Sequence, residues 1–294
     1  VGYEVGARIA SYIGPMAEVE DNQVKGFAEV WGVAAPVVFA AMAAAANLRK
    51  LDADQFQQAI GFATTNSPLP AGALWSSAVA LPNSKYCDAG WCCVAGVFAV
   101  ESVLAGSTSF DNALDGQRGL ARMCGVEKFD ETALIDQLGT RWLIPEVTYK
   151  PWPTCRFTHY ALSALARILE TEKLSPDEIE EIVIEPEPMA ASTRFTAPAP
   201  TTFCSRSFSY PHMVAMLVLG IPTGAAWLDA DLVSDPRVLA ISDKVRITTH
   251  PRGGDFVSTM EYGQIRTMPG GARVKTRTKE FYAETDFAIG DPWD

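Results

Sequence analysis

The spacing of apolar residues changes near residue 145, and this change limits the folds that are open to the chain. Before it, apolar residues recur at intervals of three and four, so we expect residues 1–140 to form helices. After it, an amphipathic helix over 157–171 is followed by alternating segments at 180–185, 244–249 and 271–283, as in half-buried strands. Because these elements do not repeat in a regular strand–helix–strand order, the sequence predicts an α+β fold with a mostly antiparallel sheet.

The same change divides the chain into two predicted domains. A length of 294 residues is too great for one small core. We therefore place an all-α helical domain at 1–145 and an α+β domain, which holds the sheet, at 146–294. Segment 30–46 is uncharged and consists almost entirely of small or apolar residues, as a membrane span would. It is short and interrupted by proline and glycine, so a buried helix is the better interpretation.

Composition excludes several classes of function. A net charge of −11 argues against a general nucleic-acid or anionic-membrane binder. The six cysteines show no disulfide-framework spacing, so we expect reduced thiols and a cytoplasmic location. The three histidines do not have metal-ligand spacing, and there is no glycine-rich nucleotide motif; we therefore expect no metal site and no nucleotide cofactor.

One segment concentrates groups that can do chemistry. The string from Lys150 to His159, Lys-Pro-Trp-Pro-Thr-Cys-Arg-Phe-Thr-His, contains two prolines that keep its first half out of a helix. An amphipathic helix follows directly, so the string ends at a helix N-terminus, where main-chain N–H groups favour an anion. Lys150 and Arg156 add cations there. An ordinary basic surface loop is the competing interpretation.

A second lysine lies at the start of an apolar helix. Lys85 precedes the segment 92–104, which is rich in Ala, Gly and Val. A lysine held beside an apolar helix can be partly desolvated, which lowers its pKa and suits acid–base work. An exposed lysine at a helix end is the simpler alternative.

The chain as a whole resembles the MmgE/PrpD family of 2-methylcitrate dehydratases, cis-aconitate decarboxylase and iminodisuccinate epimerase. The resemblance is most specific in the Lys150–His159 string. The other similar stretches are Gly2-Tyr3-Glu4-Val5, Gly26-Phe27, Ser84-Lys85 with Gly90-Trp91, Phe208-Ser209-Tyr210-Pro211-His212 and Asp235-Pro236-Arg237. Family members are longer at the N-terminus and usually continue beyond the end of this chain, so the chain is expected to be truncated at both ends.

The resemblance implies a fold and an activity. The expected fold is a large helical domain and a smaller α/β lid domain with a cleft between them, assembled as a homodimer without cofactors. The expected reaction is the dehydration of a small di- or tricarboxylic acid, such as a 2-alkylcitrate, through proton abstraction next to a carboxylate. Decarboxylation or epimerisation of a related acid is one alternative, and an inactive relative that serves as a binding or scaffold subunit is another.

The resemblance also implies roles for particular residues. Cations at Lys85, Lys150 and Arg156 would hold a polyanionic substrate and stabilise the charge that develops on it. The expected catalytic residues are Lys85, Lys150, His159 and His212, and the expected substrate-binding residues are Arg156, Cys155 and Tyr210.

The chain departs from the family pattern at several positions. Ala28 and Glu29 follow Gly26-Phe27 where a histidine is usual, and Cys87 stands where another histidine is common. His212 lies where the family has a different residue. An acidic Glu29 near the cleft would repel a tricarboxylate.

Overall fold

The computed structural model describes residues 1–14, 17–20, 23–27, 35–68, 78–83, 88–114, 118–126, 129, 131–259 and 265–293. The elements of the first half are α1 (Gly2–Ile13), β1 (Ala17–Glu20), β2 (Gln23–Phe27), α2 (Ala35–Arg49), α3 (Ala53–Thr65), α5 (Asp88–Leu104), α6 (Leu120–Met123) and α7 (Thr132–Ile135). Those of the second half are α8 (His159–Glu172), β3 (Ile179–Glu185), α9 (Thr193–Thr196), α10 (Phe203–Arg206), α11 (Tyr210–Val218), α12 (Ala230–Val233), α13 (Pro236–Ser242), β4 (Val245–Ile247), β5 (Gly270–Thr276) and β6 (Glu280–Thr285).

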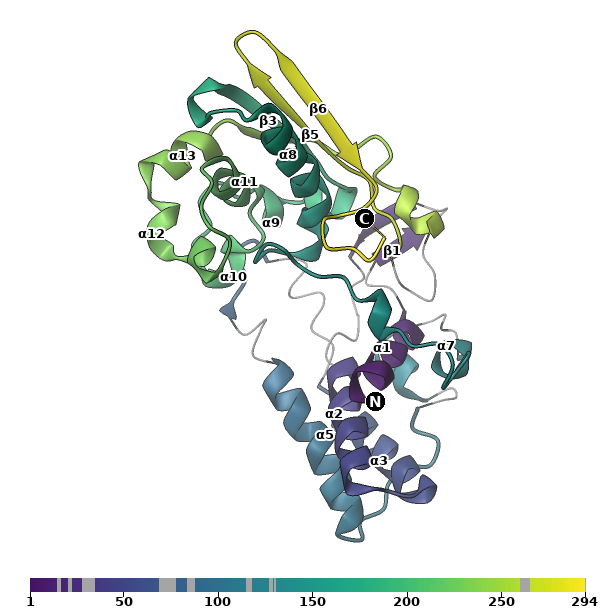
Figure 1. Cartoon of the computed structure of the whole chain (residues 1–294). Helices are drawn as coiled ribbons and strands as arrows, with labels where there is room; N and C mark the ends of the chain where they lie inside the picture. The colour runs from purple at the N-terminus through teal and green to yellow at the C-terminus, as the bar shows by residue number, and fades with distance from the viewer. Residues whose placement is uncertain are drawn as a thin grey trace.

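Two separate hydrophobic cores organise these elements. One is formed by α1, α2, α3 and α5 with the segment around α6. The other is formed by α8, the helices α9–α13 and the sheet, and it also includes Leu81 from the first half. Figure 1 shows the first group of helices at one end of the molecule and the sheet with its helices at the other. The prediction of an α+β fold is confirmed.

Small residues bring the helices of the first core close together. A Cβ on Gly96 of α5 would lie 2.5 Å from the carbonyl oxygen of Val38 on α2. A Cβ on Gly6 of α1 would lie 2.7 Å from the carbonyl oxygen of Pro36, also on α2. Glycine is therefore required at both positions, because α1 and α5 each pack against the main chain of α2. The alanine-rich composition of α2 serves the same close packing.

A buried arginine ties α1 to the segment that leads into the second half. Arg8 pairs with Glu4 at 2.9 Å, one turn earlier. Its guanidinium also donates to the carbonyl oxygens of Asp136, at 2.8 Å, and Arg141, at 3.1 Å. Glu4 in turn accepts from the main-chain N–H of Leu143 at 2.8 Å. These charge-assisted bonds fix the chain just before the proline-rich string.

The sheet is mixed, and the prediction of a mostly antiparallel sheet is wrong. Its strand order is β4-β3-β5-β6, with β3–β5 and β5–β6 antiparallel. β3 and β4, however, run parallel, with Ile182 opposite Val245. A parallel pair needs a long crossover connection, and α9–α13 all lie between these two strands. The alternating pattern located the strands but held no information on their direction.

Helix α8 covers one face of the sheet. Its apolar side chains Leu162, Leu165 and Ile168 are buried in the same core as Ile182 and Val274 of the sheet. The approach is close at the start of β5. A Cβ on Gly270 would lie 2.6 Å from the main-chain nitrogen of Ala161. This packing fixes the N-terminal end of α8, where the proline-rich string ends.

Two expectations for the first half need comment. Residues 1–140 are not all helical, because β1 and β2 form an antiparallel hairpin with Ala17 opposite Phe27. Its strands are four and five residues long, too short to stand out from a helical pattern. Within the described part of the chain, none of the helices combines the length and the apolar composition that a bilayer span requires.

Candidate functional site

The string from Lys150 to Cys155 is a loop held at both ends by main-chain hydrogen bonds. The N–H of Tyr149 donates to the carbonyl oxygen of Gly290 at 2.8 Å, and the N–H of Cys155 donates to that of Ser207 at 2.8 Å. Inside the loop, the N–H of Thr154 donates to the carbonyl oxygen of Trp152 at 2.8 Å. With the two prolines, these bonds hold the main chain in one conformation.

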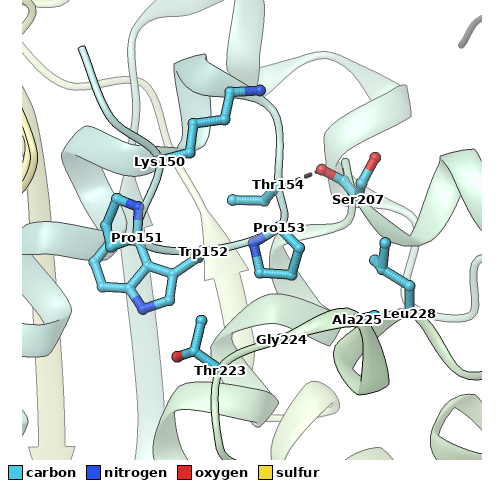
Figure 2. A pocket seen from close by; sticks show the side chains of 10 residues that line it. All are labelled: Lys150, Pro151, Trp152, Pro153, Thr154, Ser207, Thr223, Gly224, Ala225 and Leu228. Carbon is cyan, nitrogen blue, oxygen red and sulfur yellow. Dashed lines mark hydrogen bonds between the residues drawn. The ribbon is translucent and has the colours of Figure 1, made fainter.

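A pocket of about 510 Å³ opens beside this loop. Figure 2 shows Trp152 and Pro153 at its centre, with Lys150 on the side opposite to Thr223 and Gly224. The residues that line it are Lys150, Pro151, Trp152, Pro153, Thr154, Ser207, Thr223, Gly224, Ala225 and Leu228. The last two belong to a 3₁₀ turn at Ala225–Leu228. This volume lies within the range of small-molecule sites.

Lys150 is the only ionisable side chain among the described residues that line this pocket. The polar groups around it are largely engaged with the main chain. Thr154 donates its hydroxyl hydrogen to the carbonyl oxygen of Ser207 at 2.6 Å (Figure 2). Ser207 donates its own hydroxyl hydrogen to the carbonyl oxygen of Cys204 at 2.7 Å. The exposed ammonium of Lys150 is therefore the charged group that an anionic ligand in the pocket would meet.

His159, at the first residue of α8, lies behind the loop and is fully buried. Its ring packs against the indole of Trp152, with ring centroids 5.5 Å apart and a tilt of 34°. Among the described residues neither ring nitrogen has a hydrogen-bond partner of normal geometry. Burial lowers the pKa of His159 to about 3, helped by the charges of Arg156 and Lys150, while the nearby Thr154 main chain opposes the shift. The imidazole is therefore neutral at physiological pH.

Arg156 is directed away from the Lys150 pocket. Its guanidinium forms an ion pair with Asp291, whose side chain is buried, and lies over the ring of Tyr160 at 4.9 Å. It lines a second cavity of about 350 Å³, together with Tyr3, Glu146 and other residues. The structure therefore places Lys150 and Arg156 in different cavities, and the two do not face one ligand as the resemblance implied.

His212 and Tyr210 lie at the start of α11 and are core residues. Burial lowers the pKa of His212, whose Nε2 lies 2.7 Å from the carbonyl oxygen of Trp227. Burial raises the pKa of Tyr210 well above its ordinary value, and its hydroxyl donates to the carbonyl oxygen of Phe157 at 3.5 Å. Neither residue lines the Lys150 pocket. Their predicted roles remain predictions.

The remaining predicted residues are only partly placed. Cys155 is half-buried and caps the short 3₁₀ turn Arg156–Thr158 that leads into α8. Lys85 and Cys87 lie outside the described residues, as do Ala28 and Glu29. The described segment before Lys85 contacts the second half, since Thr202 donates its hydroxyl hydrogen to the carbonyl oxygen of Leu81 at 2.6 Å.

Sequence reasoning missed several residues of the site. Ser207, Thr223 and Gly224 line the pocket, yet they belong to no motif and come together only in the folded chain. Outside the pocket lining, Glu187 is a buried ionisable residue that was missed as well. It is buried, it accepts from the N–H groups of Met189 and Ala190 at 2.7 Å, and its burial raises its pKa to about 7. The Glu187-Pro188 pair is a usable signal, because it marks the start of a helical turn.

Among the described residues, no group of three or more His, Cys, Asp or Glu side chains could hold a metal ion. Comparison with curated proteins found no match. Two family models do match the chain. The MmgE/PrpD N-terminal domain matches residues 1–132, and the MmgE/PrpD C-terminal domain matches residues 152–293. These matches give no support to the expected truncation. The chain therefore belongs to the MmgE/PrpD family, a family of dehydratase-like and related enzymes.

Proposed function

We propose that this protein is a cofactor-independent lyase of the dehydratase type. Its substrate would be a small di- or tricarboxylic acid, such as a 2-alkylcitrate, from which it removes a proton next to a carboxylate. The main support besides family membership is the Lys150 pocket. It is large enough for such an acid, and a single exposed cation is the ionisable group among its described lining residues.

Lys150 has a direct role in this chemistry. Its ammonium would pair with a carboxylate of the bound acid. When the neighbouring C–H bond breaks, its electron pair delocalises into that carboxylate, and a cation already in place stabilises the added negative charge. The apolar surfaces of Trp152, Pro153 and Leu228 line the pocket beside this cation.

Proton NMR in D₂O tests the proposal. The protein would be incubated with 2-methylcitrate, citrate, cis-aconitate and iminodisuccinate in turn. New alkene signals indicate dehydration, and an itaconate-like product indicates decarboxylation. Deuterium entering next to a carboxylate without net conversion indicates epimerisation. We expect alkene signals that disappear in Lys150→Ala and persist in Lys279→Ala, which removes an exposed lysine from the β5–β6 turn.

Two results would contradict the proposal. One is the absence of any change in all four acids with a folded protein, which would favour a binding or scaffold subunit. The other is full activity in Lys150→Ala, which would move the reaction away from this pocket.

We also propose that the protein acts as a homodimer that uses α5. One face of α5 packs on α2 and α3, while Trp91, Val94 and Phe98 at helical spacing are 65%, 56% and 55% exposed. A stripe of large apolar side chains on a helix suits burial against a second copy of the same surface.

A further inference from the structure

The imidazole of His159 is fully buried, and its packing contacts do not explain why a polar side chain is needed at this position. Apart from the main chain of Thr154, which opposes the lowering of its pKa, its neighbours are apolar or cationic, and among the described residues neither ring nitrogen has a hydrogen-bond partner of normal geometry. His212, the other buried histidine of the second core, instead has its Nε2 bonded to a carbonyl oxygen. Buried polar groups in folded proteins are almost always well paired, so an imidazole without a hydrogen bond of normal geometry can accept a further partner, such as a bound substrate.

Trp152 is the side chain that separates His159 from the Lys150 pocket. Its indole packs against the imidazole and also lines the pocket. His159 is fully buried, and it is absent from the pocket lining. The two residues that flank Trp152 are prolines, and the Trp152 carbonyl oxygen is bonded to Thr154. The main chain is thus restrained, whereas the indole has an open cavity of about 510 Å³ beside it.

We propose that Trp152 is a movable cover between the Lys150 pocket and His159, and that a carboxylic acid held by Lys150 meets the imidazole when the indole swings into the pocket. This inference rests on the proposed function for the nature of the substrate. It makes Trp152 a positioning residue and makes the imidazole the proton acceptor, because the movement that uncovers the ring also removes the burial that lowers its pKa.

The step balances for dehydration of a 3-hydroxy acid. The imidazole takes the proton from the carbon next to the carboxylate, and the electron pair of that C–H bond becomes the new C=C bond. The C–O bond to the hydroxyl group breaks, and the oxygen leaves as water with a proton from the Lys150 ammonium. Solvent then removes the proton from His159 and returns one to Lys150.

Labelling with diethylpyrocarbonate, which modifies neutral imidazoles, tests the cover in the free protein. Mass spectrometry of peptides follows His159, His212 and His250 separately. We expect His159 to be labelled at least about tenfold faster than His212, because a side-chain movement exposes the first while only a larger opening exposes the second. Equal slow labelling of His159 and His212 would overturn the proposal.

Variants separate a movable cover from general loosening. Trp152→Ala should increase labelling of His159 several-fold further and leave His212 unchanged. Trp142→Ala, which removes a half-exposed indole elsewhere, should change neither. Faster labelling of both histidines in Trp152→Ala would mean that the indole only stabilises the core, and it would overturn the role of Trp152.

Labelling in the presence of substrate is a separate test that does not depend on the comparison of variants. In the presence of the acid that the protein converts, labelling of His159 should fall several-fold while labelling of His212 stays constant. Unchanged labelling of His159 under saturation by that acid would overturn its contact with the substrate. If no acid is converted, the proposed function fails, whereas the movable cover is still decided by the labelling of the free protein.

Discussion

Arg156 and Asp291 form an ion pair across 135 residues of sequence, and this pair joins the end of the proline-rich loop to the end of the chain. Asp291 also accepts from the N–H of Ala288 at 2.8 Å. The carboxylate is buried, so its charge depends on these donors. The pair explains why Arg156 faces away from Lys150, although the two are only six positions apart.

Replacing Asp291 by Asn should destabilise the protein. The substitution keeps the shape but leaves the Arg156 guanidinium without its counter-charge. We expect the free energy of unfolding to fall by about 2–4 kcal/mol, less than for a fully buried pair because Arg156 is 22% exposed. Urea titration measures the change. Asp235→Asn, which breaks an exposed pair with Arg237, is the matched control and should have a much smaller effect. Equal losses of stability in the two variants would show that burial does not increase the contribution of the Arg156–Asp291 pair.

The pH dependence of the free energy of unfolding should reveal the raised pKa of Glu187. Its pKa is raised to about 7 by burial, so the folded state holds a proton that the unfolded chain has lost above pH 4.5. The contribution of this group is therefore complete below pH 4.5 and is lost as the pH rises to about 7. In Glu187→Gln nothing titrates, so stability relative to the parent should rise over this interval, by at most about 1.4 kcal/mol per pH unit.

The prediction is stated as the difference in stability between the parent protein and Glu187→Gln, because the buried histidines change stability with pH in the opposite direction to Glu187. The pKa of His159 is lowered to about 3, so its contribution is lost as the pH falls below 6.5. That effect is common to both proteins and cancels. Glu170→Gln, at an exposed position of α8, is the control. A difference between parent and Glu187→Gln that stays flat from pH 4.5 to 7 would refute the raised pKa.

Gly270 should not tolerate a side chain. Gly270→Ala places a methyl group 2.6 Å from the main-chain nitrogen of Ala161, where neither strand β5 nor helix α8 can yield easily. We expect a loss of about 1–3 kcal/mol in the free energy of unfolding. Gly254→Ala is a suitable comparison, because a Cβ there meets no atom within 4 Å. Thermal unfolding of both variants gives the answer, and equal melting temperatures would mean that α8 can move away from the sheet.

The exposed stripe of α5 should control assembly. Phe98→Glu places a charge in the centre of the proposed dimer contact and should convert the protein to monomers in sedimentation velocity. Leu138→Glu changes an equally exposed apolar residue away from α5 and should leave the assembly unchanged. A parent protein that is monomeric, or a Phe98→Glu variant that is still dimeric, would exclude this contact.

The sequence predicted those parts of the fold that depend on local interactions. The helix after the proline-rich string is confirmed, although its first turn, Arg156–Thr158, is a 3₁₀ helix. The capping box of Asp52 and Gln55 at the start of α3 is a local interaction of the same kind, since it involves only four consecutive residues. The parallel pairing of β3 with β4 was missed, because it depends on how five intervening helices fold back over the sheet.

For the candidate site, too, the sequence predicted local features but not contacts between residues far apart in the chain. The proline-rich string was identified as a loop, and the structure exposes Lys150 on it beside a pocket. The separation of Lys150 from Arg156 was not predictable, since it is set by Asp291, which is distant in the sequence. The burial of His159 likewise depends on Trp152 and on the packing of α8 on the sheet. The spacing of residues within the string does not predict either contact.

Leu81 makes the two halves of this protein dependent on each other during folding. Its side chain is fully buried in the core of the second half, although α3 before it and α5 after it belong to the first. A ribosome that has released only residues 1–145 has made Leu81 but none of its neighbours from α8 onwards. Leu81 cannot be buried until these neighbours have been synthesised. Bringing residues that are so far apart in the sequence into contact has an entropic cost. We therefore expect fragments cut near residue 145 to associate when they are mixed, since the second core is complete only with a contribution from the first fragment.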